Sequence, residues 1–156
     1  MRLVFWVALV ILIADQASKY LVVQVMDLAF IGAIDVFPPY LNLRMAWNYG
    51  INFGLFAQAS DAMRWGLIAL ALGIAGGVLW WVSKHPPGRW GLVSAGLLIG
   101  GALGNVVDRV IYGAVADFLN MSCCGFVNPY AFNIADISIF AGALGLVLFT
   151  SEKKAP

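Results

Sequence analysis

Long apolar stretches alternate with short polar segments along this chain. Two of the stretches, residues 65–83 and 90–107, contain no Asp, Glu, Lys or Arg. Each is close to the roughly 20 residues that a helix needs to cross the hydrocarbon core of a bilayer. The pattern therefore predicts two membrane-spanning helices, and the sequence HPPG at residues 85–88 predicts a tight turn between them.

Two further apolar stretches are too short to span a membrane alone. Residues 3–14 and 137–151 are uncharged, but a helix rises only ~1.5 Å per residue and the hydrocarbon core is ~30 Å thick. Each stretch becomes long enough only by continuing through an aspartate, Asp15 in the first and Asp136 in the second. The sequence thus predicts one integral-membrane domain over residues 1–156, with spans at about residues 3–22, 62–83, 90–111 and 132–151.

The first stretch has a second interpretation, as a secretory signal peptide. Arg2 precedes an apolar run that ends in small residues, and cleavage after Ala17 would remove Asp15. We favour a membrane span, because three other apolar segments already provide membrane insertion.

The segment between the first two spans predicts a small β element. In YLNLRMAWN, the larger apolar residues of 41–47 alternate with polar or small residues at a period of two, which is typical of a strand. The preceding FPP breaks a helix, and the following NYGINFG predicts a turn. Ser60 and Asp61 have the pattern of a helix cap at the start of the second span.

Glycines recur at intervals of four in the predicted third span, at Gly96, Gly100 and Gly104. Small residues so spaced allow helices to approach closely. Gly73 and Gly77 in the second span have the same spacing, so both helices are expected to pack through glycine faces.

Composition agrees with a polytopic membrane protein. Hydrophobic residues make up 62% of the chain and charged residues only 11%, whereas soluble domains have ~25% charged residues. The net charge of +1 gives no indication of nucleic-acid binding. A single histidine, His85, and the adjacent Cys123 and Cys124 do not form the spaced clusters of usual metal sites. We expect no metal and no cofactor.

The charged residues predict an orientation. With four spans, one side holds five of the nine basic residues and the other holds seven of the eight acidic ones. The positive-inside rule then places both termini in the cytoplasm. The basic residues on that side are Arg2, Lys84, Arg89, Lys153 and Lys154.

Polar residues gather where the pattern predicts the outer rim of the membrane. Asn105, Asp108 and Arg109 stand at i, i+3 and i+4 and share a helix face. Asp117 follows that helix after a turn, and Asp136 begins the last span. Ionisable residues at membrane depth usually face a protein interior and mark function.

Spacing alone leaves several interpretations of these residues open. Asp15 and Lys19 could simply neutralise each other as an i,i+4 surface pair. Asp108 and Arg109 could cap the third span or pair with neighbours, and Asn48 could be only a turn residue.

The pair Asp117 and Asp136 has three possible roles. Two carboxylates that approach without enough counter-ions share a proton, which makes one a general base and the other a general acid. A catalytic dyad, a proton or cation pathway, and structural pairing are all compatible with the spacing.

The order of the motifs resembles one family over nearly the whole chain. The motifs GNVVDR and FNIAD together, at this spacing around an Asp-Phe, are specific, and the family is lipoprotein signal peptidase, also called signal peptidase II. The matching stretches are Asp15, NYG at 48–50, GNVVDR at 104–109, DF at 117–118 and FNIAD at 132–136.

The resemblance implies an aspartic endopeptidase of the bacterial inner membrane. Such enzymes remove the signal peptide from a prolipoprotein, cutting just before a cysteine that carries a diacylglyceryl group.

The implied fold is all-α membrane: four transmembrane helices, a small periplasmic β-cradle at about residues 28–58, and a short periplasmic surface helix. The sequence SDAMRW at 60–65, or the residues just before it, could supply that helix. The implied partners are the prolipoprotein, membrane lipid and inhibitors of the globomycin class, and we expect a monomer with its active site near the periplasmic face.

The resemblance also assigns residues by position. Asp117 and Asp136 match the catalytic pair. The residues that match the family's supporting and substrate-binding positions are Asp15, Asn48, Gly50, Gly104, Asn105, Asp108, Arg109, Asn133 and Ala135.

The chain departs from the family pattern in two places. Ile51 and Asn52 are bulkier than the small residues often found after the glycine of this motif, and Cys123–Cys124 is an unusual pair in the connection to Phe132.

Two other functions would use the same residues. A small proton- or cation-coupled carrier would bind its ion at the same carboxylates, but the uncharged middles of the second and third spans disfavour a continuous polar path. A purely structural membrane subunit would tolerate asparagine at both aspartates.

Overall fold

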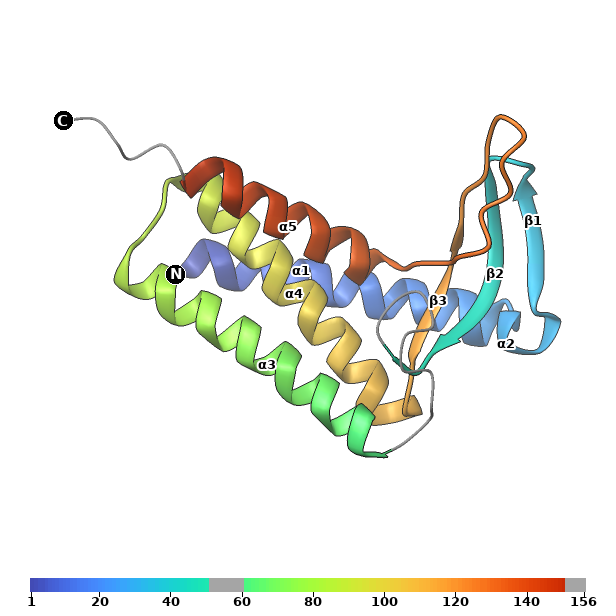
Figure 1. The fold of residues 1–156 in the computed structure, drawn as a ribbon, viewed down its shortest axis with the longest axis horizontal. Coiled ribbons are helices and arrows are strands. Elements are labelled where there is room, and N and C mark those ends of the chain that lie inside the picture. Colours follow the sequence, from blue (N-terminus) through green and yellow to red (C-terminus); the bar gives the residue numbers. More distant parts are fainter. Residues whose placement is uncertain (51–60, 151–156) are drawn as a thin grey trace.

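The computed structural model describes residues 1–50 and 61–150 of the chain. Its helices form an elongated bundle, and its strands form a sheet at one end of that bundle (Figure 1). In chain order the elements are α1 (Arg2–Lys19), the π-helix η1 (Tyr20–Val25), α2 (Leu28–Ile31), β1 (Ala33–Phe37), β2 (Leu41–Asn48), α3 (Asp61–Lys84), α4 (Arg89–Tyr112), β3 (Val115–Asn120) and α5 (Ile134–Thr150).

Three helical segments of the described chain are long and apolar enough to cross a membrane. They are Arg2–Val25, which joins α1 to η1, and the helices α3 and α4, each 24 residues long. The helix α5 is apolar but has only 17 residues. It begins at Ile134 rather than at the predicted residue 132, because Phe132 pairs with Leu119 of β3 instead of joining the helix.

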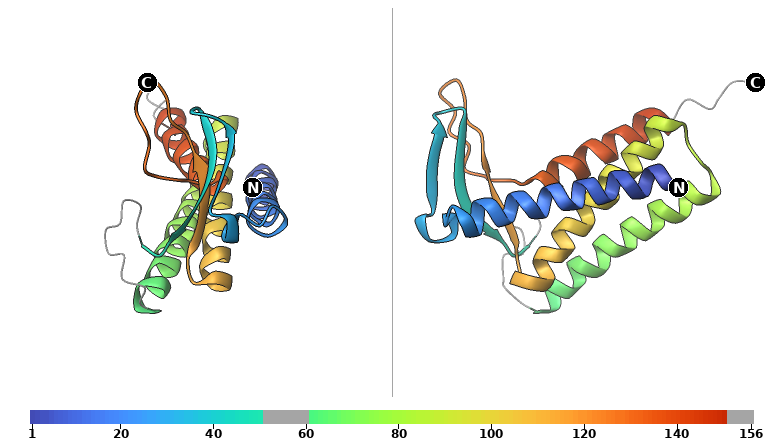
Figure 2. Two further views of the ribbon diagram at one scale, coloured as in Figure 1. Left: turned by 90° about the vertical axis from the view of Figure 1, so that its right-hand side faces the viewer. Right: turned by 180° about the vertical axis from the view of Figure 1, so that it is seen from behind.

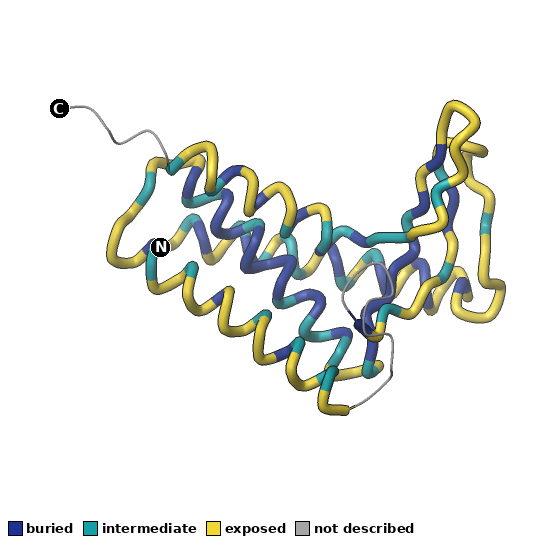
Figure 3. Tube along the Cα trace, in the orientation of Figure 1, coloured by how far each residue is buried: buried dark blue, intermediate teal, exposed yellow. Residues whose placement is uncertain are grey.

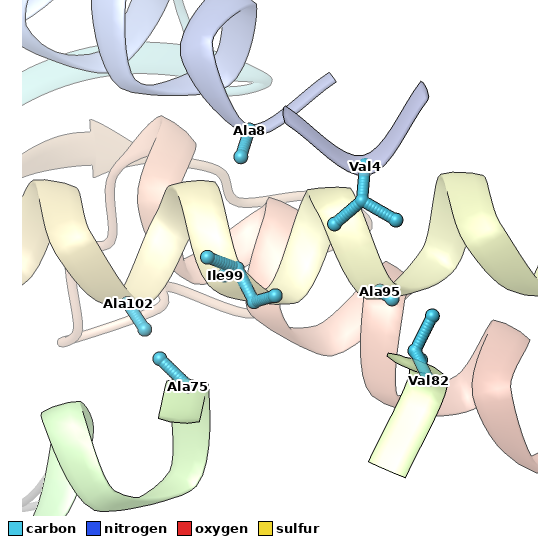
Figure 4. Close-up of a cluster of buried hydrophobic side chains, with 7 residues drawn as sticks. All are labelled: Val4, Ala8, Ala75, Val82, Ala95, Ile99 and Ala102. Carbon is cyan, nitrogen blue, oxygen red and sulfur yellow. The ribbon is translucent and has the colours of Figure 1, made fainter. Parts of the chain in front are cut away.

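The helix α4 occupies the centre of the bundle. It packs against α1, α3 and α5, and it is the most deeply buried helix (Figure 3). In its most apolar 18-residue stretch 61% of the residues are buried, against 22% in the corresponding stretch of α3. The helix α3 makes its main contacts with α4. Small apolar side chains fill the space between α1, α3 and α4, namely Val4, Ala8, Ala75, Val82, Ala95, Ile99 and Ala102 (Figure 4).

The glycines of α4 permit its close contact with α1, as predicted. A Cβ atom added to Gly96 would lie 2.6 Å from Cβ of Val7, and one added to Gly100 would lie 2.6 Å from the carbonyl oxygen of Ala8. The same prediction is wrong for Gly73 and Gly77, because a Cβ atom there would meet nothing within 4 Å. These two glycines lie on the exposed face of α3.

The three strands form one antiparallel sheet in the order β1–β2–β3. The predicted strand at residues 41–47 is confirmed as β2. Its second half pairs with β3, so that Ala46 lies opposite Asp117 and Asn48 lies opposite Val115. The sheet lies at the end of the bundle opposite the N-terminus, so β3 delivers Asp117 to the sheet end of α4 and α5 (Figure 2).

One of the two predicted positions for a short surface helix is wrong, because residues 61–65 form the first turns of α3. The other predicted position, just before residue 60, lies outside the described residues. A short helix that was not predicted, α2, lies between η1 and β1. The predicted cradle at 28–58 contains β1 and β2, but its third strand comes from residues 115–120. Ile51, Asn52 and Ser60 lie outside the described residues.

Candidate active site

Two asparagines connect the carboxylates of Asp117 and Asp136. The Nδ2 of Asn133 donates to Oδ1 of Asp117 at 2.7 Å, and Nδ2 of Asn105 donates to Oδ1 of Asp136 at 3.0 Å. The two amides meet as well, since Asn133 Nδ2 lies 3.4 Å from Oδ1 of Asn105. A continuous chain of hydrogen bonds therefore links residues from β3, α4 and the start of α5.

The start of α5 holds Asp136 in a capping box. Oδ1 of Asn133 accepts a hydrogen bond from the backbone N–H of Asp136 at 2.9 Å, and Oδ2 of Asp136 accepts one from the N–H of Asn133 at 3.2 Å. This reciprocal pair satisfies two backbone donors that a helix N-terminus would otherwise leave free. The motif FNIAD thus both starts the helix and fixes the orientation of its aspartate.

Asp117 lies in β3, outside the membrane-spanning helices, and is buried. Besides Asn133, its partner is Asn48 of β2, whose Nδ2 donates to Oδ2 at 3.1 Å. Burial, together with the nearby charge of Asp136, raises the pKa of Asp117 to about 7, although the hydrogen bonds from Asn48 and Asn133 oppose that shift. A carboxyl group with this pKa can take up or release a proton near neutral pH.

Behind these carboxylates lies a buried ionic cluster of three residues. Nζ of Lys19 is 2.7 Å from Oδ2 of Asp15 and 2.8 Å from Oδ2 of Asp108. The side chains are only 4%, 0% and 0% exposed, so the interpretation of Asp15 and Lys19 as a surface pair is wrong. The end of α1 is covered here by α4 and by the start of α5, and Gly104 makes room: a Cβ atom there would lie 2.5 Å from Oδ2 of Asp15.

The two acids of this cluster also bind backbone groups. Oδ1 of Asp15 accepts the N–H of Ala135 at 3.0 Å, and Oδ2 of Asp108 accepts the N–H of Ala116 at 3.0 Å. Asp108 therefore does not cap its own helix, whose C-terminal residue is followed by Gly113 in the left-handed conformation.

Arg109 lies at the edge of the site and is half-buried. Its guanidinium donates to the carbonyl oxygen of Asn105 at 3.3 Å and to that of Gly50 at 3.4 Å. The N–H of Gly50 in turn donates to Oδ1 of Asn48 at 3.2 Å. Asn48 is thus more than a turn residue, because it joins the strand end, the Asn-x-Gly turn and Asp117.

A cavity of about 460 Å³ opens between α3, α4 and α5 beside this network. Asp136, Asn105 and Arg109 lie at its polar end. The rest of its wall is mainly apolar and contains Leu67, Leu70, Ala71, Ile74, Leu98, Ala102, Val115, Ile139 and Ala143. Asp136 thus lies at the end of an apolar groove, where a carboxylate can act on a chain that is itself largely apolar.

Comparison with known proteins agrees with this arrangement. Residues 7–151 match the family model described as signal peptidase (SPase) II. The chain belongs to the signal peptidase II family.

Individual relatives cover almost the whole chain. Lipoprotein signal peptidases are 38% identical in Methylobacterium sp. (strain 4-46), over 92% of this chain and 86% of the relative, and 40% identical in Aeromonas hydrophila, over 96% and 89%. A solved structure described as a bacterial membrane enzyme is 27% identical, covers 98% of this chain and 93% of its own, and superposes with a TM-score of 0.80. Membership of an aspartic peptidase family gives no support to the carrier interpretation.

The structure brings together every residue that the signal peptidase II resemblance singled out. Asp117 and Asp136 share one network with Asn48, Gly50, Asn105, Arg109 and Asn133, whereas Asp15, Gly104, Asp108 and Ala135 surround the buried ionic cluster. Within residues 1–50 and 61–150, no group of three or more His, Cys, Asp or Glu side chains could hold a metal ion.

Sequence reasoning missed the role of two residues here, Lys19 in the cluster and Gln16 beside it. Lys19 was interpreted only as the partner of Asp15, and Gln16 was not considered. Nε2 of Gln16 donates to Oδ1 of Asp108 at 2.9 Å and to Oδ2 of Asp15 at 3.1 Å. The available signal was the position of both residues inside the first long apolar helix, where a polar side chain is costly unless it has partners.

Proposed function

We propose that this chain is a membrane-bound aspartic endopeptidase that removes signal peptides from diacylglyceryl-modified prolipoproteins and cuts just before the lipidated cysteine. The observation that carries the proposal is the hydrogen-bonded link from Asp117 to Asp136, which itself lies at the polar end of an apolar groove. The names of the relatives supply the substrate class, since each is a lipoprotein signal peptidase.

The proposed chemistry uses one shared proton. In this mechanism a water molecule is bound between the two carboxyl groups. The ionised carboxylate takes a proton from the water while the water oxygen bonds to the scissile carbonyl carbon. The protonated carboxyl group donates to the carbonyl oxygen. Breakdown of the tetrahedral intermediate then breaks the C–N bond, and a proton passes to the leaving nitrogen. The pKa of about 7 for Asp117 supports this assignment, because an acid–base group works best near the ambient pH.

The supporting residues hold this pair before the substrate arrives. Asn48 and Asn133 bind the two oxygens of Asp117, and Asn105 binds Asp136. Groups that are fixed in advance need little reorganisation during the reaction. Arg109 and the backbone of Gly50, at the polar edge of the groove, are placed to bind the extended backbone of the substrate.

The groove explains how a lipidated substrate could bind. Its apolar wall suits the hydrophobic core of a signal peptide, and the space between α3 and α5 would let the diacylglyceryl chains remain among membrane lipids. Inhibitors of the globomycin class would compete for the same groove. The enzyme would act as a monomer, because the acidic pair and the groove come from one chain.

We further propose four spans in the bacterial inner membrane, with both termini in the cytoplasm and the site near the periplasmic face. At ~1.5 Å per residue, the 17 residues of α5 cover ~25 Å, close to the hydrocarbon thickness. Arg2, Lys84 and Arg89 lie at the bundle end opposite the sheet (Figure 1), which supports this orientation under the positive-inside rule.

The decisive experiment incubates the detergent-purified protein with a diacylglyceryl-modified prolipoprotein and follows the mass shift on a gel. We expect cleavage by the wild type and none by Asp117→Asn or Asp136→Asn, since neither variant can share a proton between two carboxyl groups. Asp35→Asn is the matched control, because Asp35 is an exposed aspartate of β1. Full activity in either site variant would remove that residue from the pair, and a folded wild type without activity would contradict the function.

A further inference from the structure

The position of Lys19 raises a question that the family assignment leaves unanswered. Its ammonium group lies between Asp15 of its own helix and Asp108 of α4, within 2.8 Å of a carboxylate oxygen of each. It also lies 3.3 Å from Oδ1 of Asn105, the residue whose amide binds Asp136. A lysine is almost never so deeply buried without a specific set of partners.

The two carboxylates that flank Lys19 bind the two peptide groups next to the acidic pair. Asp15 accepts the N–H of Ala135, the residue directly before Asp136. Asp108 accepts the N–H of Ala116, the residue directly before Asp117. The ammonium group of Lys19 thus binds both carboxylates. Each carboxylate in turn binds the backbone N–H of the residue directly before a proposed catalytic aspartate.

Charge makes this arrangement depend on Lys19. Two carboxylates buried at this depth repel each other and lose hydration, so they hold this geometry only with a cation between them. The backbone bonds that Asp15 and Asp108 accept therefore depend on the charge of Lys19.

The other charged groups around Lys19 cannot replace it. Arg109 of α4 directs its guanidinium to backbone carbonyl groups at the edge of the site. Arg64 of α3 binds the carbonyl oxygen of Val110, and Arg44 of β2 pairs with Asp35 on the surface. In the part of the chain that the structure describes, Lys19 also interacts electrostatically with the acids Asp117 of β3 and Asp136 of α5.

We propose that Lys19 is a positioning residue for the reaction: by neutralising Asp15 and Asp108 together, it fixes the backbone directly before Asp117 and Asp136 and thereby sets the geometry and charge of the pair. The inference rests on the proposed function and adds to it a residue that touches neither the substrate nor the reacting atoms.

A purely structural role for Lys19 would predict a different pH profile. The positive charge of Lys19 lowers the pKa of Asp117 against the larger effects of burial and of Asp136. Loss of that charge therefore raises the pKa of Asp117, and the pH limits of activity move to higher pH. A lysine that only stabilised the bundle would leave the pH profile of the folded fraction unchanged.

The test compares Lys19→Gln, which keeps a hydrogen-bond donor and removes the charge, with Lys19→Arg, which keeps the charge. Lys84→Gln is the matched control, because Lys84 is exposed at the far end of α3. For each protein, kcat, KM and the thermal unfolding temperature are measured in detergent with a diacylglyceryl-modified prolipoprotein, and kcat is recorded across pH.

For Lys19→Gln we expect kcat to fall by roughly tenfold or more with little change in KM, because the loss affects the transition state more than substrate binding. We also expect its pH profile to move upward. Lys19→Arg should keep the wild-type pH profile, and Lys84→Gln should behave as the wild type throughout.

A second variant guards against a failure to fold. Asp15→Asn/Lys19→Gln removes one charge of each sign, so it keeps the net charge of the cluster, and we expect it to fold with a reduced kcat. Wild-type kcat together with a wild-type pH profile in either folded variant that lacks the Lys19 charge would overturn the positioning role. Absence of cleavage by the wild type and by Lys84→Gln would instead count against the proposed function.

Discussion

The proposed proton chemistry depends on the pKa of one side chain, Asp117, in the folded protein. Its pKa rises from 3.8 to about 7 because burial disfavours the charged form and Asp136 lies nearby. A folded-state pKa above the unfolded value means that the native state binds the proton more tightly. The stabilisation from this group is therefore complete at pH values below about 3.8 and is lost as the pH rises through about 7.

This linkage predicts a pH-dependent difference between the wild type and Asp117→Asn. Asparagine keeps the size of the side chain but does not ionise. We expect the unfolding temperature of the wild type to fall relative to that of Asp117→Asn as the pH rises from 3.8, the pKa of Asp117 in the unfolded chain, to about 7, its pKa in the folded protein. Thermal unfolding in detergent across that range checks it, and Asp35→Asn, at an exposed site, should show no such trend.

Two glycines in different surroundings, Gly104 and Gly73, are expected to respond differently to substitution by alanine. In Gly104→Ala, the new methyl group would lie 2.5 Å from Oδ2 of Asp15 and displace it from the buried cluster. Overpacking of this kind costs roughly 1–3 kcal/mol, and we also expect a lower kcat because the bond from Ala135 N–H to Asp15 is disturbed. Gly73→Ala, where the methyl group meets nothing within 4 Å, should be neutral or slightly stabilising. Equal unfolding temperatures for the two variants would contradict this.

At the level of single elements, the start of α5 combines a helix cap with a part of the site. Asn133 caps the helix through its Oδ1 and binds Asp117 through its Nδ2. These two functions can be separated by substitution, since serine keeps a capping oxygen but cannot donate to Asp117 in the same way.

We therefore expect Asn133→Ser to retain most of its stability and to lose most of its activity. Asn133→Ala should lose the activity and also about 1 kcal/mol of stability, the usual contribution of a cap. The measurements are the unfolding free energy and kcat of both variants. A fully active Asn133→Ser would show that the bond to Asp117 is dispensable.

The helix α3 allows a test of the groove. Ala71 lines the cavity between α3, α4 and α5, whereas Ala69 lies exposed on the same helix and does not line it. Ala71→Phe should fill part of the 460 Å³ and raise KM for the prolipoprotein, or prevent cleavage, without a loss of stability. Ala69→Phe, the same substitution two residues away, should leave KM unchanged. Equal KM values would place the substrate elsewhere.

For the whole molecule, the proposed orientation can be checked with the cysteines that the chain already has. Cys123 and Cys124 are exposed in the connection between β3 and α5, at the sheet end. If this end faces the periplasm, a membrane-impermeant thiol reagent should label them in intact spheroplasts. A cysteine introduced at Lys84, in a chain without the native pair, should be labelled only after permeabilisation. The opposite pattern would invert the proposed topology.

Local pattern was sufficient to predict several parts of the molecule. The helices α3 and α4 follow from the length of uncharged apolar runs, α1 follows from an apolar run extended through Asp15, and β2 follows from a period of two. The motifs at 104–109 and 132–136, around the Asp-Phe at 117–118, indicated the family. The roles of the individual site residues stay predictions. The fourth span stays a prediction, since α5 has only 17 residues. The orientation of the protein in the membrane also stays a prediction.

Tertiary contacts decided what the sequence left open. Gly100 and Gly73 occur in similar apolar segments, yet only Gly100 faces another helix. The strand β3 forms where residues distant in the chain pair with β2, and no local period reveals such a partner. The i,i+4 pair of Asp15 and Lys19 looks the same in sequence whether it lies on the surface or in the interior. Its burial, and with it the link to the backbone beside Asp117 and Asp136, arises because α4 and α5 cover that turn of α1, and the partners of a helix face are determined only when the whole chain packs.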